Sequence, residues 1–169
     1  SNASFVALYI NKKMISTAPV KNHLATFNDI VYQPGSITAV ALDDKQYELY
    51  RSELRTAEKK PYLDVQINQT ILSSNHEDLC YVTIQIKDRF GTLKTDKDYL
   101  VDIDVTGPLT FLSLGSANGF TSESFVDQSH HTYMGKLLAV FRSTAETGEA
   151  KITISAENIG TKSFSINVI

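Results

Sequence analysis

The sequence predicts an all-β protein made of two tandem β-sandwich domains, and three observations support this class. Apolar and polar residues alternate along most segments with the two-residue period of a strand. Turn signals such as Pro34-Gly35 separate these segments. The predicted strands recur at roughly 8–12-residue spacing, which is typical of sandwiches. A chain of 169 residues has room for one or two domains.

The first part of the chain consists of short strands and tight turns, with strands expected at 5–10, 37–42 and 46–54. The segment 10–15 is typical of a hairpin, because Asn11 can take a positive φ. The segment 25–32 leads into the Pro-Gly turn. Residues 1–3 fit either the remnant of a cleaved tag, which we favour, or the lead into the first strand.

Charge and a proline interrupt the strand pattern at 55–61, which we interpret as the region between two domains. We expect a small immunoglobulin-like β-sandwich at 4–57 and a linker at 58–61. A second immunoglobulin-like sandwich, of the bacterial invasin-like kind, is expected at 62–169. The first domain is short for a sandwich of about 100 residues, so it could be truncated, with one strand outside the chain.

The second part of the chain contains further predicted strands, at 62–67, 79–86, 99–105, 151–158 and 163–169. Of these, 99–105 alternates most cleanly and should place its odd-numbered residues in the core. Apolar residues of the last two strands are expected to face each other across the core. The segment 131–146 fits either a helix or a strand; Gly135 weakens a helix, and the all-β surroundings favour a strand.

Composition and charge exclude several classes of function. The net charge is −3, so the chain lacks the basic surface that neutralises nucleic-acid phosphates. No apolar run approaches the roughly 18 residues of a membrane helix. The single cysteine, Cys80, cannot form an intrachain disulfide. Its place on the apolar face of a predicted strand indicates a core residue rather than a reactive thiol.

The glycine-rich stretch 107–125 does not fit a phosphate-binding loop. Gly115 and Gly119 lie four residues apart with no lysine after them, whereas a P-loop needs wider spacing and a following Lys. His130 and His131 are adjacent, so on a strand they should point to opposite faces and cannot both bind one ion. We therefore expect solvated loop histidines, no metal site and no cofactor.

Acidic residues offer two candidate pairs for glycoside hydrolysis, Asp102 with Asp104 and Glu123 with Asp127. Both pairs fit outward-facing strand or loop positions better than a cleft. The first pair shares a strand face, which leaves calcium binding open, although a solvated sheet face is favoured. No serine lies in a nucleophile-elbow sequence. On its residues alone, the chain is expected to have no catalytic residue.

Two stretches add a family resemblance. "VALYINKKMI", "TFNDIVYQPGSITAVALDD" and "ELRTAEKK" resemble the small module that follows the catalytic barrel in bacterial β-galactosidases of glycoside hydrolase family 2. The matching positions are Asn11, Pro34, Gly35, Thr56 and Ala57. "EDLCYVTIQIKDRFG" and the tail "GKLLAVFRSTAETGEAKITISAENIG" resemble the immunoglobulin-like domain that comes next in those enzymes.

The sequence departs from the family pattern at two of these motifs. Lys12 replaces the glycine that usually follows Asn11 in the first module. In the long loop of the second module, Asn118 is followed by Gly119 where the family usually has proline.

The resemblance implies that the chain is a non-catalytic C-terminal accessory fragment of such an enzyme. Its partners would be the catalytic barrel, which this chain cannot form, and neighbouring domains. It would support the barrel and could border the substrate entrance. Asn118, Phe120 and Glu123 in the loop are the weak candidates for ligand binding, either to a sugar or in bracing the catalytic domain. The resemblance also implies a periplasmic or extracellular enzyme.

Two other functions stay open from the sequence. A carbohydrate-binding module would need exposed aromatic rings, and Tyr47, Tyr50, Phe120 and Tyr133 are the candidates in a chain without tryptophan. A bacterial cell-surface spacer or adhesin would share the immunoglobulin-like strands but not the first module. An open edge of a shortened first module would also allow self-association between chains.

Overall fold

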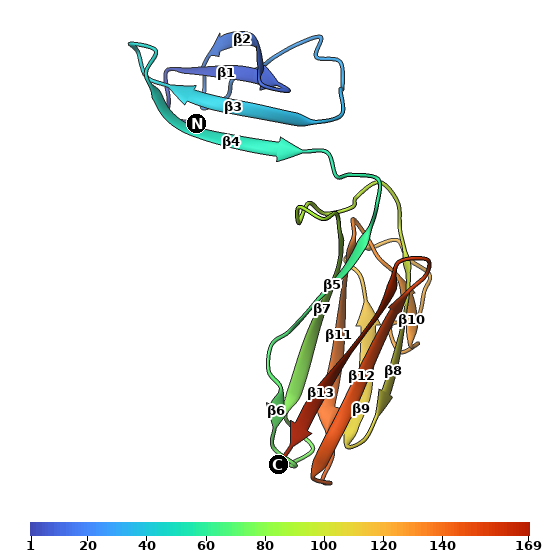
Figure 1. The fold of residues 1–169 in the computed structure, drawn as a ribbon. Helices are drawn as coiled ribbons and strands as arrows, with labels where there is room; N and C mark the ends of the chain where they lie inside the picture. Colours follow the sequence, from blue (N-terminus) through green and yellow to red (C-terminus); the bar gives the residue numbers. More distant parts are fainter. The chain divides into compact units, whose positions relative to one another are not determined.

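The computed structural model describes residues 1–169 and contains 13 strands and no helix (Figure 1). The predicted all-β class is therefore confirmed. The chain divides into two compact units, Ser1–Thr56 and Ala57–Ile169. No helix long and apolar enough to cross a membrane is present.

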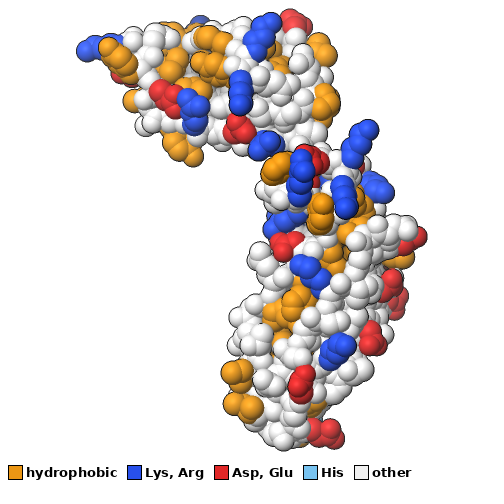
Figure 2. Space-filling view, viewed as in Figure 1, with side chains coloured by type: hydrophobic (Ala, Val, Ile, Leu, Met, Phe, Trp, Pro, Cys, Tyr) orange, Lys and Arg blue, Asp and Glu red, His pale blue; other side chains and the backbone are white.

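The first unit is one four-stranded antiparallel sheet with the strand order β2-β1-β3-β4 (Figure 1). Its strands are β1 (Phe5–Ile10), β2 (Lys13–Pro19), β3 (Ser36–Leu42) and β4 (Glu48–Arg55). β1 and β3 are central, and they supply the buried residues Ala7, Leu8, Ile10, Thr38 and Val40. Hydrophobic side chains are nevertheless visible on the surface of this unit (Figure 2).

The hairpin between β1 and β2 forms where the sequence predicts it. Asn11 and Lys12 both have positive φ, 49° and 69°, as a two-residue turn of this type requires. Asn11 also binds the Pro-Gly turn: its Oδ1 accepts from Ser36 N at 2.9 Å, and its Nδ2 donates to Pro34 O at 3.1 Å. A Cβ on Gly35 would lie 1.8 Å from Asn11 Oδ1, so this turn needs glycine.

The first unit has one sheet, where the sequence predicts a small sandwich of two. The segment 25–32 lies in the connection between β2 and β3 and forms no strand. In this connection Asn22, His23 and Asp29 have φ between 51° and 65°. Left-handed residues of this kind interrupt the extended backbone that a strand needs.

The second unit is a β-sandwich, as predicted. One sheet has the order β10-β8-β12-β13-β6 and the other β5-β7-β11-β9. The strands are β5 (Tyr62–Ile67), β6 (Ile71–Leu72), β7 (Leu79–Lys87), β8 (Leu100–Thr106), β9 (Leu109–Gly115), β10 (Ser129–His131), β11 (Lys136–Ser143), β12 (Gly148–Ala156) and β13 (Gly160–Val168). Their apolar faces form one core cluster between the sheets, which includes Cys80, Ile103 and Phe141.

Two details of this core bear on the predictions. The segment 131–146 forms strand β11 with a turn before it, where Gly135 has φ 72°, so the preference for a strand is confirmed.

The prediction that the last two strands face each other across the core is wrong. β12 and β13 are hydrogen-bonded neighbours in one sheet, with Ile152 paired to Phe164. Their apolar residues therefore lie side by side on one face.

Candidate functional site: the loop between β9 and β10

The loop at 116–128, which carries the predicted candidate residues, connects one sheet of the second unit to the other. It leaves β9 after Gly115 and enters β10 at Ser129. Leu114 N donates to Phe125 O at 2.8 Å, and Ile103 N donates to Gln128 O at 2.8 Å. The C-terminal part of the loop is thus hydrogen-bonded to a strand of each sheet.

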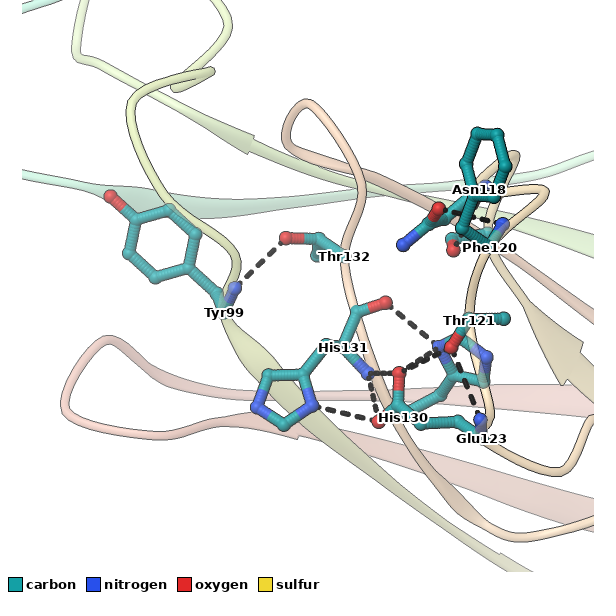
Figure 3. Close-up of polar contacts among 9 residues, drawn as sticks. Tyr99, Asn118, Phe120, Thr121, Glu123, His130, His131 and Thr132 are labelled. Atoms are coloured by element: carbon teal, nitrogen blue, oxygen red, sulfur yellow. Dashed lines mark hydrogen bonds and ion pairs between the residues drawn. The ribbon is translucent and has the colours of Figure 1, made fainter.

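Glu123 is turned back toward the strand that follows the loop (Figure 3). Its Oε1 lies 2.7 Å from Nδ1 of His131 and accepts from the backbone N–H of His131 at 3.1 Å. The hydroxyl of Thr121 donates to Oε2 at 3.2 Å. Its second oxygen also lies 3.4 Å from Nδ1 of His130. This carboxylate is therefore engaged by groups of its own loop and of β10.

The surroundings of Glu123 change its acidity. Partial burial on its own raises the pKa of the carboxyl. The hydrogen bonds from the side chain and backbone of His131, with the charges of His130 and His131, outweigh that effect. The net result is a pKa of Glu123 below its ordinary value. The group is thus held ionised, which suits a structural acceptor and not a general acid.

His130 is the buried member of this cluster, with 0% of its surface exposed. Its ring stacks on Phe125, with centroids 5.6 Å apart and planes 10° apart. Nδ1 lies 2.8 Å from the carbonyl oxygen of His131, while Nε2 is buried without a hydrogen-bond partner. The expectation of two solvated loop histidines is wrong for His130, because it lies on β10 opposite the core residue Val101 of β8.

The tip of the loop carries the other two candidates. Phe120 is 100% exposed, and its backbone N–H donates to Oδ1 of Asn118 at 3.0 Å (Figure 3). Thr121 N donates to Asn118 O at 3.3 Å, which closes the turn. An asparagine side chain that accepts a hydrogen bond from the backbone N–H two residues later is typical of a turn. The structure therefore separates the candidates: Asn118 and Phe120 lie at the tip, and Glu123 at the base.

Beside the loop, the outer face of the β5-β7-β11-β9 sheet has an open hollow of about 520 Å³. Phe125, Leu138 and Val140 give it an apolar lining, and Thr83, Ser113 and Lys136 supply the polar groups. Gly115 also lines the hollow, and a Cβ there would lie 2.5 Å from the Phe125 ring. This hollow holds no acidic side chain.

Of the other candidate carboxylates, Asp127 is exposed on the loop. Asp102 and Asp104 are exposed on β8, where they lie on the face opposite the core. No group of three or more His, Cys, Asp or Glu side chains is arranged to hold a metal ion. Cys80 is fully buried, and burial raises the pKa of its thiol to about 11. This burial agrees with the prediction of a core residue.

Asp88 is the second aspartate of the stretch "EDLCYVTIQIKDRFG", which contributes to the family resemblance. It accepts from the backbone N–H groups of Glu58, Phe90 and Thr92, each at 2.9 Å. These bonds, the one from Glu58 first, hold its pKa below the ordinary value. Lys94 Nζ also donates to Glu58 O at 3.0 Å. Asp88 therefore closes the turn after β7 and attaches the predicted linker segment to the second unit.

Comparison with known proteins places these features in a family. Residues 63–165, more than half of the chain, match the glycoside hydrolase family 2 C-terminal domain 5. Residues 1–47 match a domain of unknown function, DUF4982. The β-galactosidase BoGH2A of Bacteroides ovatus is 28% identical over 130 residues, which are 77% of this chain and 15% of that protein.

Solved structures of glycoside-cleaving enzymes share the fold. A glycosyl hydrolase family 2 member from Bacteroides cellulosilyticus matches 98% of this chain and 23% of its own, with a TM-score of 0.88 and 24% identity. A β-glycosidase from Bacteroides vulgatus matches 99% of this chain and 21% of its own, with a TM-score of 0.78 and 20% identity. The chain thus spans 15% of the length of the curated relative and less than a quarter of these structures. By the match over residues 63–165, the chain belongs to the glycoside hydrolase family 2 C-terminal domain 5 family.

Proposed function

We propose that this chain is a non-catalytic accessory part of a larger β-galactosidase-type glycosidase and that it supports the catalytic part of that enzyme. The observation that carries the proposal is the state of Glu123. Glycoside hydrolysis normally needs a pair of carboxyl groups in a cleft, one of them with a raised pKa. Glu123 is the only acidic side chain on the candidate loop within hydrogen-bond reach of a histidine, and its pKa is lowered.

The other shifted carboxyl groups support the same proposal. The pKa of Asp78 is lowered chiefly by the backbone N–H of Ser73, that of Asp88 by the backbone N–H of Glu58, and that of Glu48 by Arg51. None of these shifts favours a protonated acid at neutral pH. These three carboxylates thus accept hydrogen bonds from backbone N–H groups or from a neighbouring arginine.

An assay of the purified chain with aryl-β-galactosides, aryl-β-glucosides and aryl-β-glucuronides tests the proposal. We expect no turnover above that of a blank preparation. The matched control is the Glu123→Gln variant. Turnover by the natural chain that co-purifies with it and disappears in the variant would overturn the proposal, because it would make Glu123 a reacting group.

A carbohydrate-binding module is the second candidate function, and the fully exposed Phe120 beside Asn118 favours it. Sugar C–H faces stack on an exposed ring, and an amide can bind the hydroxyl groups. Tyr47, Tyr50 and Tyr133 are exposed as predicted. An NMR titration with galactose, lactose and plant oligosaccharides separates the functions. Chemical-shift changes at residues 116–125 that Phe120→Ala abolishes would favour sugar binding. The absence of such changes would favour the structural accessory function.

We propose, from the resemblance alone, that the parent enzyme acts in the periplasm or outside the cell. Cell fractionation of the organism that makes it, followed by immunoblotting with an antibody to this chain, tests the location. Signal in the periplasmic or secreted fraction is expected, and signal confined to the cytosol would contradict it.

A further inference from the structure

The strands β3 and β4 of the first unit present one face without any charged side chain. The register pairs Ile37 with Leu54, Ala39 with Ser52, and Ala41 with Tyr50. Residues directly opposite in an antiparallel pair project to the same side of the sheet. These six residues therefore form one face, which we call the uncharged face.

On the reverse face, β4 carries charged side chains that are paired, whereas the β3 residues Thr38 and Val40 are buried. Glu53 pairs with Thr38 and accepts a hydrogen bond from its hydroxyl at 3.1 Å. Arg51 pairs with Val40, and its guanidinium binds the Glu48 carboxylate at 2.6 Å. Such exposed ion pairs need no cover, because they remain compatible with water. The sequence of β4 thus alternates between a solvent-adapted face and an uncharged one.

The uncharged face is uncovered in this chain. Leu54 is 72% exposed, Tyr50 71% and Ile37 39%. The first unit has a single sheet, whereas a sheet normally buries its apolar face against a second layer. A contiguous exposed apolar surface of this kind marks an interaction site.

We infer that the uncharged face of β3 and β4 is the surface on which another β-sheet of the parent glycosidase packs. This inference rests on the proposed accessory function. The occupant must be flat and apolar, because the face offers no charge to pair and consists of short aliphatic side chains with one tyrosine and one serine. Face-to-face packing of sheets, at about 10 Å separation, meets that description, and the second unit of this chain is built in that way.

The parent chain is a better occupant than a second copy for a physical reason. The chain spans 15% of the β-galactosidase that it resembles, so most of such an enzyme lies outside it. A surface covalently linked to the uncharged face acts at an effective concentration in the millimolar range for short flexible linkers. A separate copy would have to reach a comparable concentration in solution to compete.

Cysteine labelling in the isolated chain and in the full-length parent enzyme tests the inference. Ser52→Cys and Leu54→Cys report on the uncharged face, and Arg51→Cys is the matched control on the reverse face of the same strand. The native Cys80 is buried and gives little background in the isolated chain. Full-length parent without an added cysteine supplies the background for the second measurement.

We expect Ser52→Cys and Leu54→Cys to react at least about tenfold more slowly in the parent than in the isolated chain, with Arg51→Cys unchanged. Equal rates in both proteins would overturn the inference, and so would equal protection of Arg51→Cys. Protection already present in the isolated chain and lost on dilution would assign the face to a second copy instead. Turnover by the isolated chain would contradict the proposed non-catalytic function. It would not change the expected difference in labelling between the isolated chain and the parent.

Discussion

Glu123 Oε1 and His131 Nδ1 lie 2.7 Å apart, and this contact joins the base of the long loop to strand β10. The same carboxylate accepts the backbone N–H of His131, so two bonds close the nine-residue segment 123–131. The contact explains why a loop rich in small residues keeps a defined course. It also removes the one acidic side chain of the stretch 107–125 from the exposed tip.

Replacement of Glu123 by Gln should loosen this closure. The variant loses the charge of the acceptor, and a hydrogen bond involving a charged group is worth about 1.5–3 kcal/mol when buried. Because Glu123 is partly exposed, we expect the free energy of unfolding to fall by about 1 kcal/mol. Urea unfolding followed by tyrosine fluorescence measures the change. Asp127→Asn, in the same loop, should change stability by less than about 0.5 kcal/mol, and an equal loss in both variants would contradict the account.

The contribution of Glu123 should depend on pH in one direction. Its pKa is lower in the folded chain than in the unfolded one, so the folded state is favoured while the group is ionised. That stabilisation is complete above the ordinary glutamate value of about 4.3 and is lost as the pH falls through the lower folded value. The difference in urea midpoint between the natural chain and Glu123→Gln should therefore shrink from neutral pH to about pH 3. A difference that stays constant or grows would contradict it.

Gly115 and Gly119 give a matched pair of substitutions. A Cβ on Gly115 would lie 2.5 Å from the ring of Phe125, which stacks on buried His130, whereas nothing lies within 4 Å of a Cβ on Gly119. Gly115→Ala should destabilise the chain by about 1–3 kcal/mol through overpacking. Gly119→Ala should be neutral within about 0.5 kcal/mol. Thermal unfolding by circular dichroism would reveal the contrast, and the reverse order would show that the contact is unimportant.

Cys80 should be chemically inert while the chain is folded. The thiolate is the reactive form, and burial raises the pKa of this thiol to about 11. A chromogenic thiol reagent should therefore detect no reactive thiol in native buffer and one thiol per chain in guanidinium chloride. Rapid native reaction would mean that β7 opens on the timescale of the assay.

The sequence predicted most of the fold because local rules and tertiary structure agree there. The period-two pattern of 99–105 places Val101 and Ile103 in the core, and Asn11 forms the predicted turn. The number of sheets in the first unit was not predictable in this way. Segment 25–32 has strand-like composition, and its exclusion from the sheet depends on left-handed residues such as Asp29 that no periodicity reveals.

The loop shows a second limit of sequence reasoning. The sequence groups Asn118, Phe120 and Glu123 as candidates, yet their roles differ because Glu123 contacts His131 only after the chain reverses direction. The burial of His130 follows from its pairing with Val101 of β8, a contact distant in sequence. One signal is present in the sequence: Phe125 and His130 flank a four-residue segment, 126–129, in which three residues are polar, as an aromatic pair closing a loop would.

The central claim is that this chain supports a glycosidase without taking part in its chemistry. The most direct measurement compares the full-length parent enzyme with a version that lacks the residues equivalent to 1–169, by thermal unfolding and by kcat at a temperature where both are folded. The account predicts a clearly lower Tm for the shortened enzyme and a kcat within about twofold of the intact one. Loss of kcat by orders of magnitude in a still-folded shortened enzyme would contradict it, as would an unchanged Tm.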